Sequence, residues 1–342
     1  MRILLTGATG VLGAVVAREL ASHAELTAVV RRRKLPLDEV RQVPGDLTQA
    51  GMGLDARDRH DIVAATDVIV HCGAMTGFGN KPDVPRRVNV EGTNRILELA
   101  AAAKARLVHV STAFVARVAE FESSPAAADL RTPVSYVRSK VEAEDLVFGS
   151  GLDPVVVRPS VLMGDSTTGR IEAFQGWHTM CGAAIAGQTP FLPAGPDALV
   201  DCVPVDFAAR AVARIALTGA APGEWWLTAG DDAFTLGESL DRCLREAATR
   251  GLAPHRPRLL PREMVERLVL PAFGEGVPPE LRRQMLEGLE LMRMFGSEHR
   301  FPSRWPAELG APAPNRDELE GAFDQSLRYL CDEYGLQRRE AA

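Results

Sequence analysis

The chain has 342 residues, of which 46% are hydrophobic and 25% are charged, fractions typical of an ordinary globular protein and not of a disordered one. Its 39 Lys and Arg residues against 45 Asp and Glu residues give a net charge of −6. This acidic balance argues against binding to nucleic acid or to an anionic membrane surface, both of which require a basic field.

Short, almost continuously apolar runs alternate with helical stretches through the first 160 residues. We predict strands over 3–6, 26–30, 40–43, 68–70, 107–110 and 154–157. We predict helices over 11–22, 57–65, 84–103 and 135–149. Strands that are buried on both faces and alternate with helices indicate an α/β fold with a doubly wound parallel Rossmann sheet.

The pattern loosens after Pro159, where glycine and proline residues interrupt the chain. Further helices are predicted over 206–217, 236–250, 261–270, 279–295 and 316–334, and one strand over 224–228. We therefore predict two parts. Residues 1–160 form a Rossmann domain for cofactor and catalysis, and residues 161–342 form a smaller, mostly helical substrate-binding region interleaved with the sheet edge.

Three glycines, Gly7, Gly10 and Gly13, lie between the first predicted strand and the first predicted helix. A tight turn, a close approach of backbone to a pyrophosphate and close helix packing each favour a residue without a Cβ atom, and the helix N-terminus attracts phosphate. The motif predicts a dinucleotide site. Its other expected contact residues are Thr9, Val11 and Leu12.

Arg31 and Arg32 follow the second predicted strand, where NAD-binding proteins carry an acidic residue for the ribose 2′-hydroxyl. Guanidinium groups suit a 2′-phosphate instead, so these arginines favour NADP(H) over NAD(H). The alternative interpretation is a solvated basic loop.

Other cofactor contacts are expected at the carboxyl ends of the third and fourth strands. Asp46 could bond the adenine amine, although a plain turn aspartate fits the sequence nearly as well. His71 is interpreted as a structural histidine rather than a catalyst. The remaining contacts expected at these strand ends are Leu47, Cys72, Gly73 and Ala74.

Tyr136 and Lys140 share one face of a predicted helix because they are four residues apart. A neighbouring ammonium group favours the phenolate form of a tyrosine, so we expect Lys140 to lower the pKa of Tyr136 and to make it usable for proton transfer. Thr112 ends the fifth strand, where its hydroxyl can bond a substrate oxygen. These three residues are the predicted catalytic group.

The five cysteines are widely spaced and form no CxxC motif. This pattern favours buried thiols in a reducing compartment over disulfides or a zinc site, and we expect no metal. No apolar run is long enough to span a membrane, and the early glycine turn leaves no room for a signal peptide, so we expect a cytoplasmic protein.

Taken together, these motifs resemble the extended branch of the short-chain dehydrogenase/reductase family over roughly residues 1–230. The resemblance implies hydride transfer at a nicotinamide, with Tyr136 as general acid or base and Lys140 on both Tyr136 and the nicotinamide ribose. It aligns Thr112, not Ser111, with the family's catalytic Ser/Thr. It also places the backbone of Pro159 to Val161 near the carboxamide, so that Pro159 and Val161 become cofactor contacts.

Three stretches, 109–115, 157–176 and 200–206, are most similar to the thioester reductase and fatty acyl-CoA reductase (male sterility) group. Such enzymes use NADPH to reduce an acyl thioester on CoA or on a carrier protein, so the resemblance implies an acyl substrate and an acyl carrier protein as a candidate partner. The resemblance does not extend to residues 251–342. Relatives occur as monomers and as homodimers, and both remain open for this chain.

Two other functions compete with this interpretation. A nucleotide-sugar epimerase or dehydratase, or a hydroxysteroid-type dehydrogenase, shares the fold, but the basic candidates between Val161 and Val200 are only Arg170 and His178, too few to favour a pyrophosphate substrate. A non-catalytic NADP-sensing protein would keep the glycine turn, but such proteins typically lose the Tyr/Lys pair. An excess of arginine over acidic residues across 241–304 fits either a docking surface for an acidic carrier or a solvated helical face.

Overall fold

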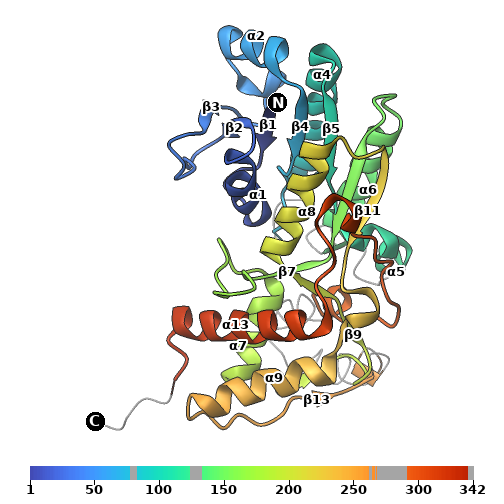
Figure 1. Ribbon diagram of the computed structural model, residues 1–342. Helices are drawn as coiled ribbons and strands as arrows, with labels where there is room; N and C mark the ends of the chain where they lie inside the picture. The colour runs from blue at the N-terminus through green and yellow to red at the C-terminus, as the bar shows by residue number, and fades with distance from the viewer. Residues whose placement is uncertain (78–82, 124–132, 262–263, 266, 268–290, 338–342) are drawn as a thin grey trace. The chain divides into compact units, whose positions relative to one another are not determined.

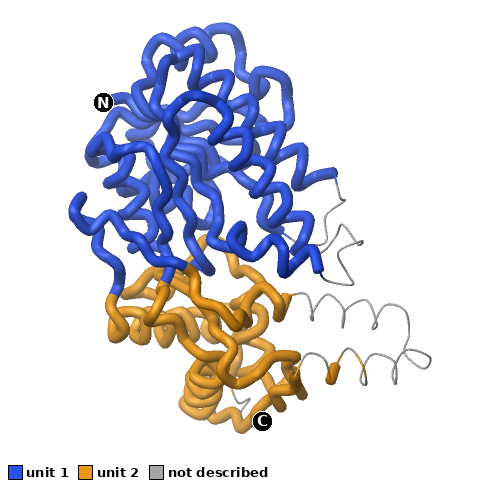
Figure 2. The backbone as a smooth tube through the Cα atoms, turned by 90° about the vertical axis from the view of Figure 1, so that its right-hand side faces the viewer, with its two compact units in different colours: residues 1–162, 205–228, 302–314 blue, residues 163–204, 229–301, 315–342 orange. Residues whose placement is uncertain are grey.

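The computed structural model describes residues 1–77, 83–123, 133–261, 264–265, 267 and 291–337. It divides into two compact units (Figure 2). Unit 1 comprises 1–162, 205–228 and 302–314, and unit 2 comprises 163–204, 229–301 and 315–342. The sequence pattern predicts a substrate-binding region over 161–342 that is interleaved with the sheet edge. Two segments of that region belong to unit 1, because one supplies a helix and the last strand of its sheet and the other pairs with that strand.

Unit 1 is built on a seven-stranded sheet in which every strand pair is parallel. The strands are β1 (Arg2–Thr6), β2 (Glu25–Val30), β3 (Arg41–Pro44), β4 (Val68–His71), β5 (Arg106–Val110), β6 (Val155–Pro159) and β11 (Gly223–Leu227). Their order is β11-β6-β5-β4-β1-β2-β3 (Figure 1). The order reverses direction between β1 and β4, which defines the switch point where doubly wound sheets bind ligands. The predicted fold class is confirmed.

Helices connect most of these strands, as is usual for parallel pairs, whereas residues 31–40 between β2 and β3 contain no helix. The longer ones in unit 1 are α1 (Val11–Ala21), α2 (Ala56–Ala65), α4 (Gly92–Ala103), α6 (Pro133–Phe148) and α8 (Val205–Thr218). The shorter ones are η1 (Ala50–Gly53), α3 (Asp83–Pro85), η2 (Arg86–Glu91), η3 (Ala113–Arg117), α5 (Val118–Glu122) and η7 (Ala307–Leu309). The predicted helix over 84–103 is thus three consecutive pieces, and its middle piece, η2, is a π-helix.

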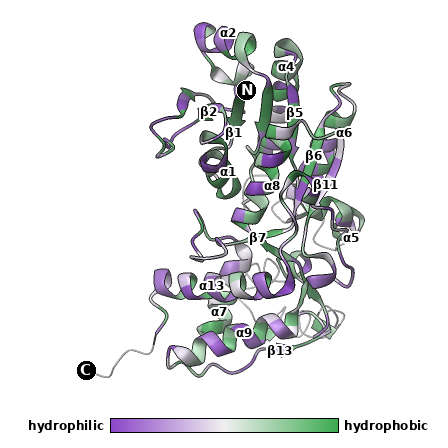
Figure 3. Ribbon diagram, in the orientation of Figure 1, coloured by the Kyte–Doolittle hydropathy of each residue, from purple (hydrophilic) through white to green (hydrophobic). Residues whose placement is uncertain are grey.

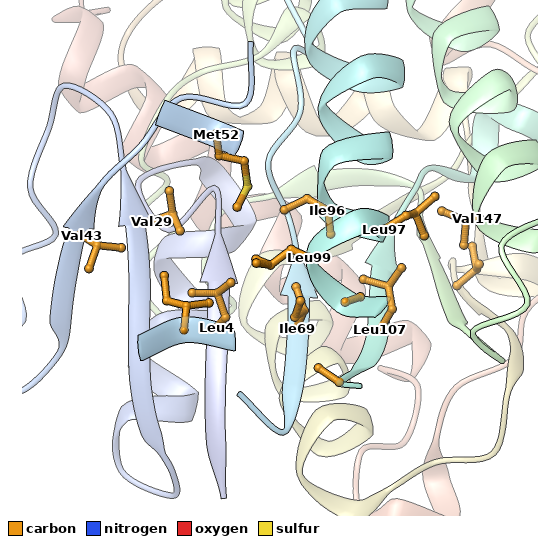
Figure 4. Packing of buried hydrophobic residues seen from close by; sticks show 14 residues of the cluster. Leu4, Val29, Val43, Met52, Ile69, Ile96, Leu97, Leu99, Leu107 and Val147 are labelled. Atoms are coloured by element: carbon orange, nitrogen blue, oxygen red, sulfur yellow. The ribbon is translucent and has the colours of Figure 1, made fainter. Parts of the chain in front are cut away.

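Apolar side chains from neighbouring strands form the core on one side of the sheet. Leu4, Ile69 and Leu107 come from β1, β4 and β5, and they pack with Ile96 and Leu99 from α4 (Figure 4). The central strands β1, β4 and β5 are accordingly largely green, the colour of hydrophobic residues, in Figure 3. This core packs against β1, β4 and β5, which pair in parallel, so their carboxyl ends lie at the same edge of the sheet.

Unit 2 is mainly helical in its described part. Its helices are α7 (Gly176–Ile185), α9 (Leu236–Thr249) and α13 (Arg316–Tyr334), with a short η5 (Gly230–Asp232). Its short strands are β8 (Phe191–Leu192), β9 (Leu199–Val200), β10 (Cys202–Pro204), β12 (Phe234–Thr235) and β13 (Arg258–Leu259), and β7 (Val161–Met163) spans the first unit boundary.

Three arginines tie α9 to α13 within unit 2. Arg242 on α9 donates to Asp324 over 2.8 Å and stacks on Phe234, with its guanidinium 5.5 Å from the ring centre. Arg250, which follows α9, bonds Asp332 over 2.7 Å, and Arg316 bonds a glutamate of α9. The predicted helices over 261–270 and 279–295 lie largely outside the described residues. In the part of the chain that is described, no helix is both long and apolar enough to cross a membrane.

Candidate active site

The glycine turn after β1 places backbone where side chains do not fit. Gly7 has a φ of +72°, and a Cβ atom on it would lie 2.6 Å from the backbone of Cys72 and Gly73. A Cβ atom on Gly13 would lie 2.1 Å from the Gly7 carbonyl oxygen. The turn, the first helix and the loop after β4 are therefore in backbone contact, as the sequence predicts for a dinucleotide-binding turn.

The N-terminus of α1 opens on this turn. Gly10 is its N-cap residue and is exposed, no side chain caps the helix, and its first turn carries no acidic residue. The first N–H groups of a helix attract anions, and nothing described around this terminus opposes a phosphate. The glycine turn therefore fits the pyrophosphate of a dinucleotide.

The basic segment that follows β2 lies near the carboxyl end of β3. Arg31 is about half exposed, and its Nη1 atom lies 3.9 Å from Oδ2 of Asp46. Arg33, which is not among the cofactor contacts predicted from the sequence, donates from Nη2 to the carbonyl oxygen of Thr9 over 2.8 Å. Arg32 is also exposed. These guanidinium groups fit a 2′-phosphate beside the glycine turn.

Asp46 has the hydrogen bonds of a turn aspartate. Its Oδ1 atom accepts from the backbone N–H and the hydroxyl of Thr48, over 2.9 and 2.8 Å. Partial burial acts to raise the pKa of Asp46, but these bonds and the charges of Arg31 and Arg32 outweigh it and hold the pKa below its usual range. Oδ1 thus serves the turn, and Oδ2 is the atom that faces Arg31.

His71, at the end of β4, sits in a chain of hydrogen bonds. Its Nδ1 atom is 2.6 Å from the Thr6 hydroxyl, and its Nε2 atom is 3.2 Å from the Thr93 hydroxyl. Thr93 donates to the Asn89 carbonyl, so its oxygen accepts from Nε2–H, and Thr6 donates to Nδ1. Burial lowers the pKa of His71 to about 3, with a further contribution from Lys140. The histidine is neutral and fully bonded, which is the structural role predicted for it.

The three residues predicted to be catalytic come together in unit 1. Thr112 follows β5, Tyr136 lies in the first turn of α6, and the side chains of the two residues are hydrogen-bonded. Lys140 lies one turn further along α6, is 2% exposed, and donates from Nζ to the Val110 carbonyl oxygen over 2.9 Å. The predicted common face of Tyr136 and Lys140 is present on α6.

The expected effect of Lys140 on Tyr136 is wrong for this structure. Burial raises the pKa of Tyr136 to about 12, against the lowering effect of its bond with Thr112. The sequence predicts how far apart two side chains are along a helix but not how deeply they are buried, and burial disfavours the phenolate. Tyr136 is therefore a neutral phenol at neutral pH, a state suited to donating a proton.

Asn89 on η2 is a buried residue whose contacts no sequence pattern indicates. Its side chain accepts from the Met75 backbone N–H over 2.7 Å and donates to the Met75 carbonyl over 3.1 Å and to the Ser139 hydroxyl over 2.9 Å. Ser139 in turn donates to the Tyr136 carbonyl. Asn89 thus fastens the loop after β4 to the helix that carries Tyr136.

The other predicted cofactor contacts surround the same sheet edge. Cys72, Gly73 and Ala74 follow β4 beside the glycine turn, and the Gly73 N–H donates to Thr6 over 3.3 Å. The other predicted residues lie at the turn, in the start of α1, after β3, at the end of β6 and at the start of β7; they are Thr9, Val11, Leu12, Leu47, Pro159 and Val161.

The part of the chain that carries Tyr136 and Lys140 matches a known protein family. Residues 29–212 match the sequence model of the family described as male sterility protein. Since this match covers more than half of the chain, the chain belongs to that family, which lies within the extended short-chain dehydrogenase/reductases. Membership confirms the predicted family and, with it, the class of NAD(P)-dependent oxidoreductases.

Several of the similar proteins are synthases or reductase domains. The chain is 32% identical over 249 residues to part of the linear gramicidin synthase of Brevibacillus parabrevis, a match that covers 63% of the chain and spans 5% of that synthase polypeptide. Its fold resembles the terminal R domain of the myxalamid PKS-NRPS pathway (TM-score 0.70, 22% identity, 98% of this chain and 92% of that one). It also resembles a thiolation-reductase di-domain of an archaeal non-ribosomal peptide synthetase (TM-score 0.69, 17% identity, 98% of this chain and 76% of that one).

Proposed function

We propose that this protein is an NADPH-dependent reductase that converts an acyl thioester, carried on CoA or on a carrier protein, to an aldehyde. The observation that carries the proposal is the Thr112–Tyr136 hydrogen bond beside the buried Lys140, at the same sheet edge as a glycine turn built for a pyrophosphate. The family match and the reductase domains among the relatives support the choice of a thioester.

The reduction needs a hydride, a proton and a way to hold the carbonyl oxygen. NADPH, when bound, supplies the hydride to the carbonyl carbon. The hydroxyls of Thr112 and Tyr136 would both bond the substrate oxygen, and Tyr136 would give it a proton as the hydride arrives, which forms a hemithioacetal. Collapse of this species breaks the carbon–sulfur bond, the sulfur leaves as a thiol, and the aldehyde remains.

The protonation state of Tyr136 agrees with this direction of reaction. A phenol whose pKa is raised to about 12 holds its proton until the substrate oxygen becomes basic. Lys140 would bond the nicotinamide ribose and hold positive charge near the phenolate that forms. Its bond to Val110 fixes the ammonium group at the strand end.

The basic segment supports a preference for NADPH. Arg31 and Arg32 are exposed at the place where a 2′-phosphate would lie, and Arg33 anchors the segment to the glycine turn. Asp46 accepts the Thr48 hydrogen bonds with Oδ1, and its Oδ2 atom interacts with Arg31. We propose as the other cofactor contacts the individual residues predicted from the sequence, of which Gly7 is the first in the chain and Val161 the last.

We further propose that the part of 161–342 that does not belong to unit 1 binds the acyl group. We also propose that a carrier protein is the partner and that the protein acts in the cytoplasm. The thiolation-reductase di-domain among the structural relatives supports the partner. The proposed reduction is compatible with either a monomer or a homodimer.

A substrate panel tests the proposal. NADPH oxidation is followed with acyl-CoA, acyl-pantetheine, aldehyde, ketone and UDP-sugar substrates, and the products are identified. We expect oxidation with the thioesters and an aldehyde, or the alcohol from its further reduction, as product. Turnover confined to UDP-sugars would overturn the proposal in favour of a nucleotide-sugar enzyme.

A further inference from the structure

A buried ion pair lies next to Lys140 on the inner face of α6. Glu144 follows Lys140 by one helical turn, and the two residues are 6% and 2% exposed. Arg158 on β6 binds both oxygens of the Glu144 carboxylate, with Nε at 2.9 Å and Nη2 at 2.5 Å. A carboxylate held in two-point contact by a guanidinium has a fixed position.

Arg158 is itself held from its other side. It bonds Glu224 on β11 over 2.7 and 3.0 Å, and its guanidinium lies 4.5 Å from the ring centre of Trp226. One arginine therefore serves two carboxylates. Glu144 is buried and lies one helical turn from Lys140. The side chain of Glu224 is 43% exposed and lies on β11, the edge strand of the sheet.

The other described titratable groups around Lys140 are neutral. His71 on β4 and His109 on β5 have pKa values lowered far below neutrality by burial, aided by the charge of Lys140. Burial raises the pKa of the Cys72 thiol to about 12, and Tyr136 holds its proton as well. Burial lowers the pKa of Lys140 to about 8, and the main effect that opposes this fall is the charge of Glu144.

We propose that Glu144 is a positioning residue for the proposed reduction: held by Arg158, it supplies the negative charge that keeps Lys140 an ammonium ion at the reacting end of α6. This inference rests on the proposed function for its kinetic consequence but not for its electrostatic one. The two are therefore tested separately.

Glu144→Gln and Glu224→Gln form a matched pair of variants. Each removes one negative charge from the same arginine with almost no change in shape, but only the first removes a charge beside Lys140. Residues four apart on a helix have neighbouring side chains, and an opposite charge within about 4–6 Å shifts a pKa by about one unit or more. A purely structural role for the ion pair predicts that neither variant shifts the pH dependence.

The first readout is the pH profile of kcat/KM. We expect activity to fall above about pH 8 in the wild type as Lys140 loses its proton. The fall should begin at a pH lower by about one unit in Glu144→Gln and should stay in place in Glu224→Gln. Profiles of the two variants that coincide would overturn the proposal.

The second readout is thermal stability, which needs no activity. At pH 6 Lys140 is charged, so Glu144→Gln loses its attraction to Glu144, whereas at pH 9 Lys140 is largely neutral in the folded protein and has little attraction to lose. The drop in Tm caused by Glu144→Gln should therefore be larger at pH 6 than at pH 9. The drop caused by Glu224→Gln should be the same at both pH values, because Glu224 bonds Arg158 from β11 and is not on the helix that carries Lys140.

The two readouts separate the two hypotheses. If no substrate is reduced but the Tm drops behave as described, the proposed function fails and the role of Glu144 stands. If Glu144→Gln does not fold, Glu144→Asp is measured in the same way; it keeps the charge but withdraws it by one methylene, and a smaller shift in the same direction is expected. No shift in Glu144→Asp would then contradict the proposal.

Discussion

Thr112 and Tyr136 share a side-chain hydrogen bond although they come from the end of a strand and the start of a helix some two dozen residues apart. The bond lies at the carboxyl edge of the sheet, next to the glycine turn. Two hydroxyls that meet here can hold one substrate oxygen between them. This relationship determines what each variant of the site should do.

Removal of the Tyr136 hydroxyl should abolish most of the reduction. We expect Tyr136→Phe to lower kcat about 10²- to 10⁴-fold, the usual contribution of a positioned proton donor, and to leave NADPH affinity within a few fold. Thr112→Val should lower kcat to a smaller extent. Steady-state kinetics and fluorescence titration with NADPH check the two effects, and full activity of Tyr136→Phe would refute its role as proton donor.

Replacement of the exposed arginines should change the choice of cofactor. A charged hydrogen bond contributes about 1.5–3 kcal/mol, so the double variant Arg31→Ala, Arg32→Ala should raise the KM for NADPH about 10- to 100-fold or more and leave the KM for NADH nearly unchanged. Arg41→Ala, which removes an exposed ion pair on the neighbouring strand, is the control. An equal effect on both cofactors would show that the arginines are only a solvated loop.

The two glycines of the turn should respond differently to the same substitution. Alanine normally stabilises a helix relative to glycine by about 1 kcal/mol, but a Cβ atom on Gly13 would lie 2.1 Å from the Gly7 carbonyl oxygen. We expect Gly13→Ala to destabilise the fold by about 1–3 kcal/mol. A Cβ atom on Gly10 would be 3.2 Å from the same oxygen. Gly10→Ala should therefore still fold, but it should bind NADPH more weakly than the wild type. Denaturant unfolding and cofactor titration separate the two outcomes.

Buried histidines should make the protein sensitive to acid. Both ring nitrogens of His109 lack a hydrogen-bond partner among the described residues, and burial holds its pKa well below 6.5. The unfolded chain therefore binds a proton that the folded one does not, and stability falls as pH drops below about 6.5, by up to about 1.4 kcal/mol for each pH unit.

His109→Leu tests this origin of acid sensitivity. The variant should lose less stability than the wild type between pH 7 and pH 5, and at pH 7 it should be about as stable, since no hydrogen bond is removed. His60→Leu, at an exposed position on α2, is the matched control for loss of an imidazole. Denaturant unfolding at each pH measures the effect, and an unchanged loss in His109→Leu would contradict it.

Much of the sheet could be predicted because buried parallel strands read as short apolar runs. The predicted strands and helices of residues 1–160 are present with their ends shifted by a few residues at most. What the pattern could not show is which elements pair. The sequence predicts a strand over 224–228 but not its partner, and in the structure this strand, β11, pairs with β6. A short run of residues identifies a strand and not its neighbour.

The candidate site was only partly predictable for a similar reason. Helical spacing placed Lys140 one turn from Tyr136, and the same spacing applied once more would have found Glu144. The contacts of Asn89 with Met75 and Ser139 join segments far apart in the chain and have no periodic signal. Burial, which raises the pKa of Tyr136, depends on everything packed around α6 and is not visible in a local motif.

The most direct test of the account is product analysis of a single reaction, with an acyl-pantetheine or acyl-CoA substrate, NADPH and either the wild type or Tyr136→Phe. We expect the wild type to consume NADPH and to release free thiol and aldehyde in equal amounts, with any alcohol accounting for a second NADPH, and we expect the variant to produce almost none. Thiol released without NADPH consumption, or equal turnover by Tyr136→Phe, would contradict a reduction in which Tyr136 donates the proton.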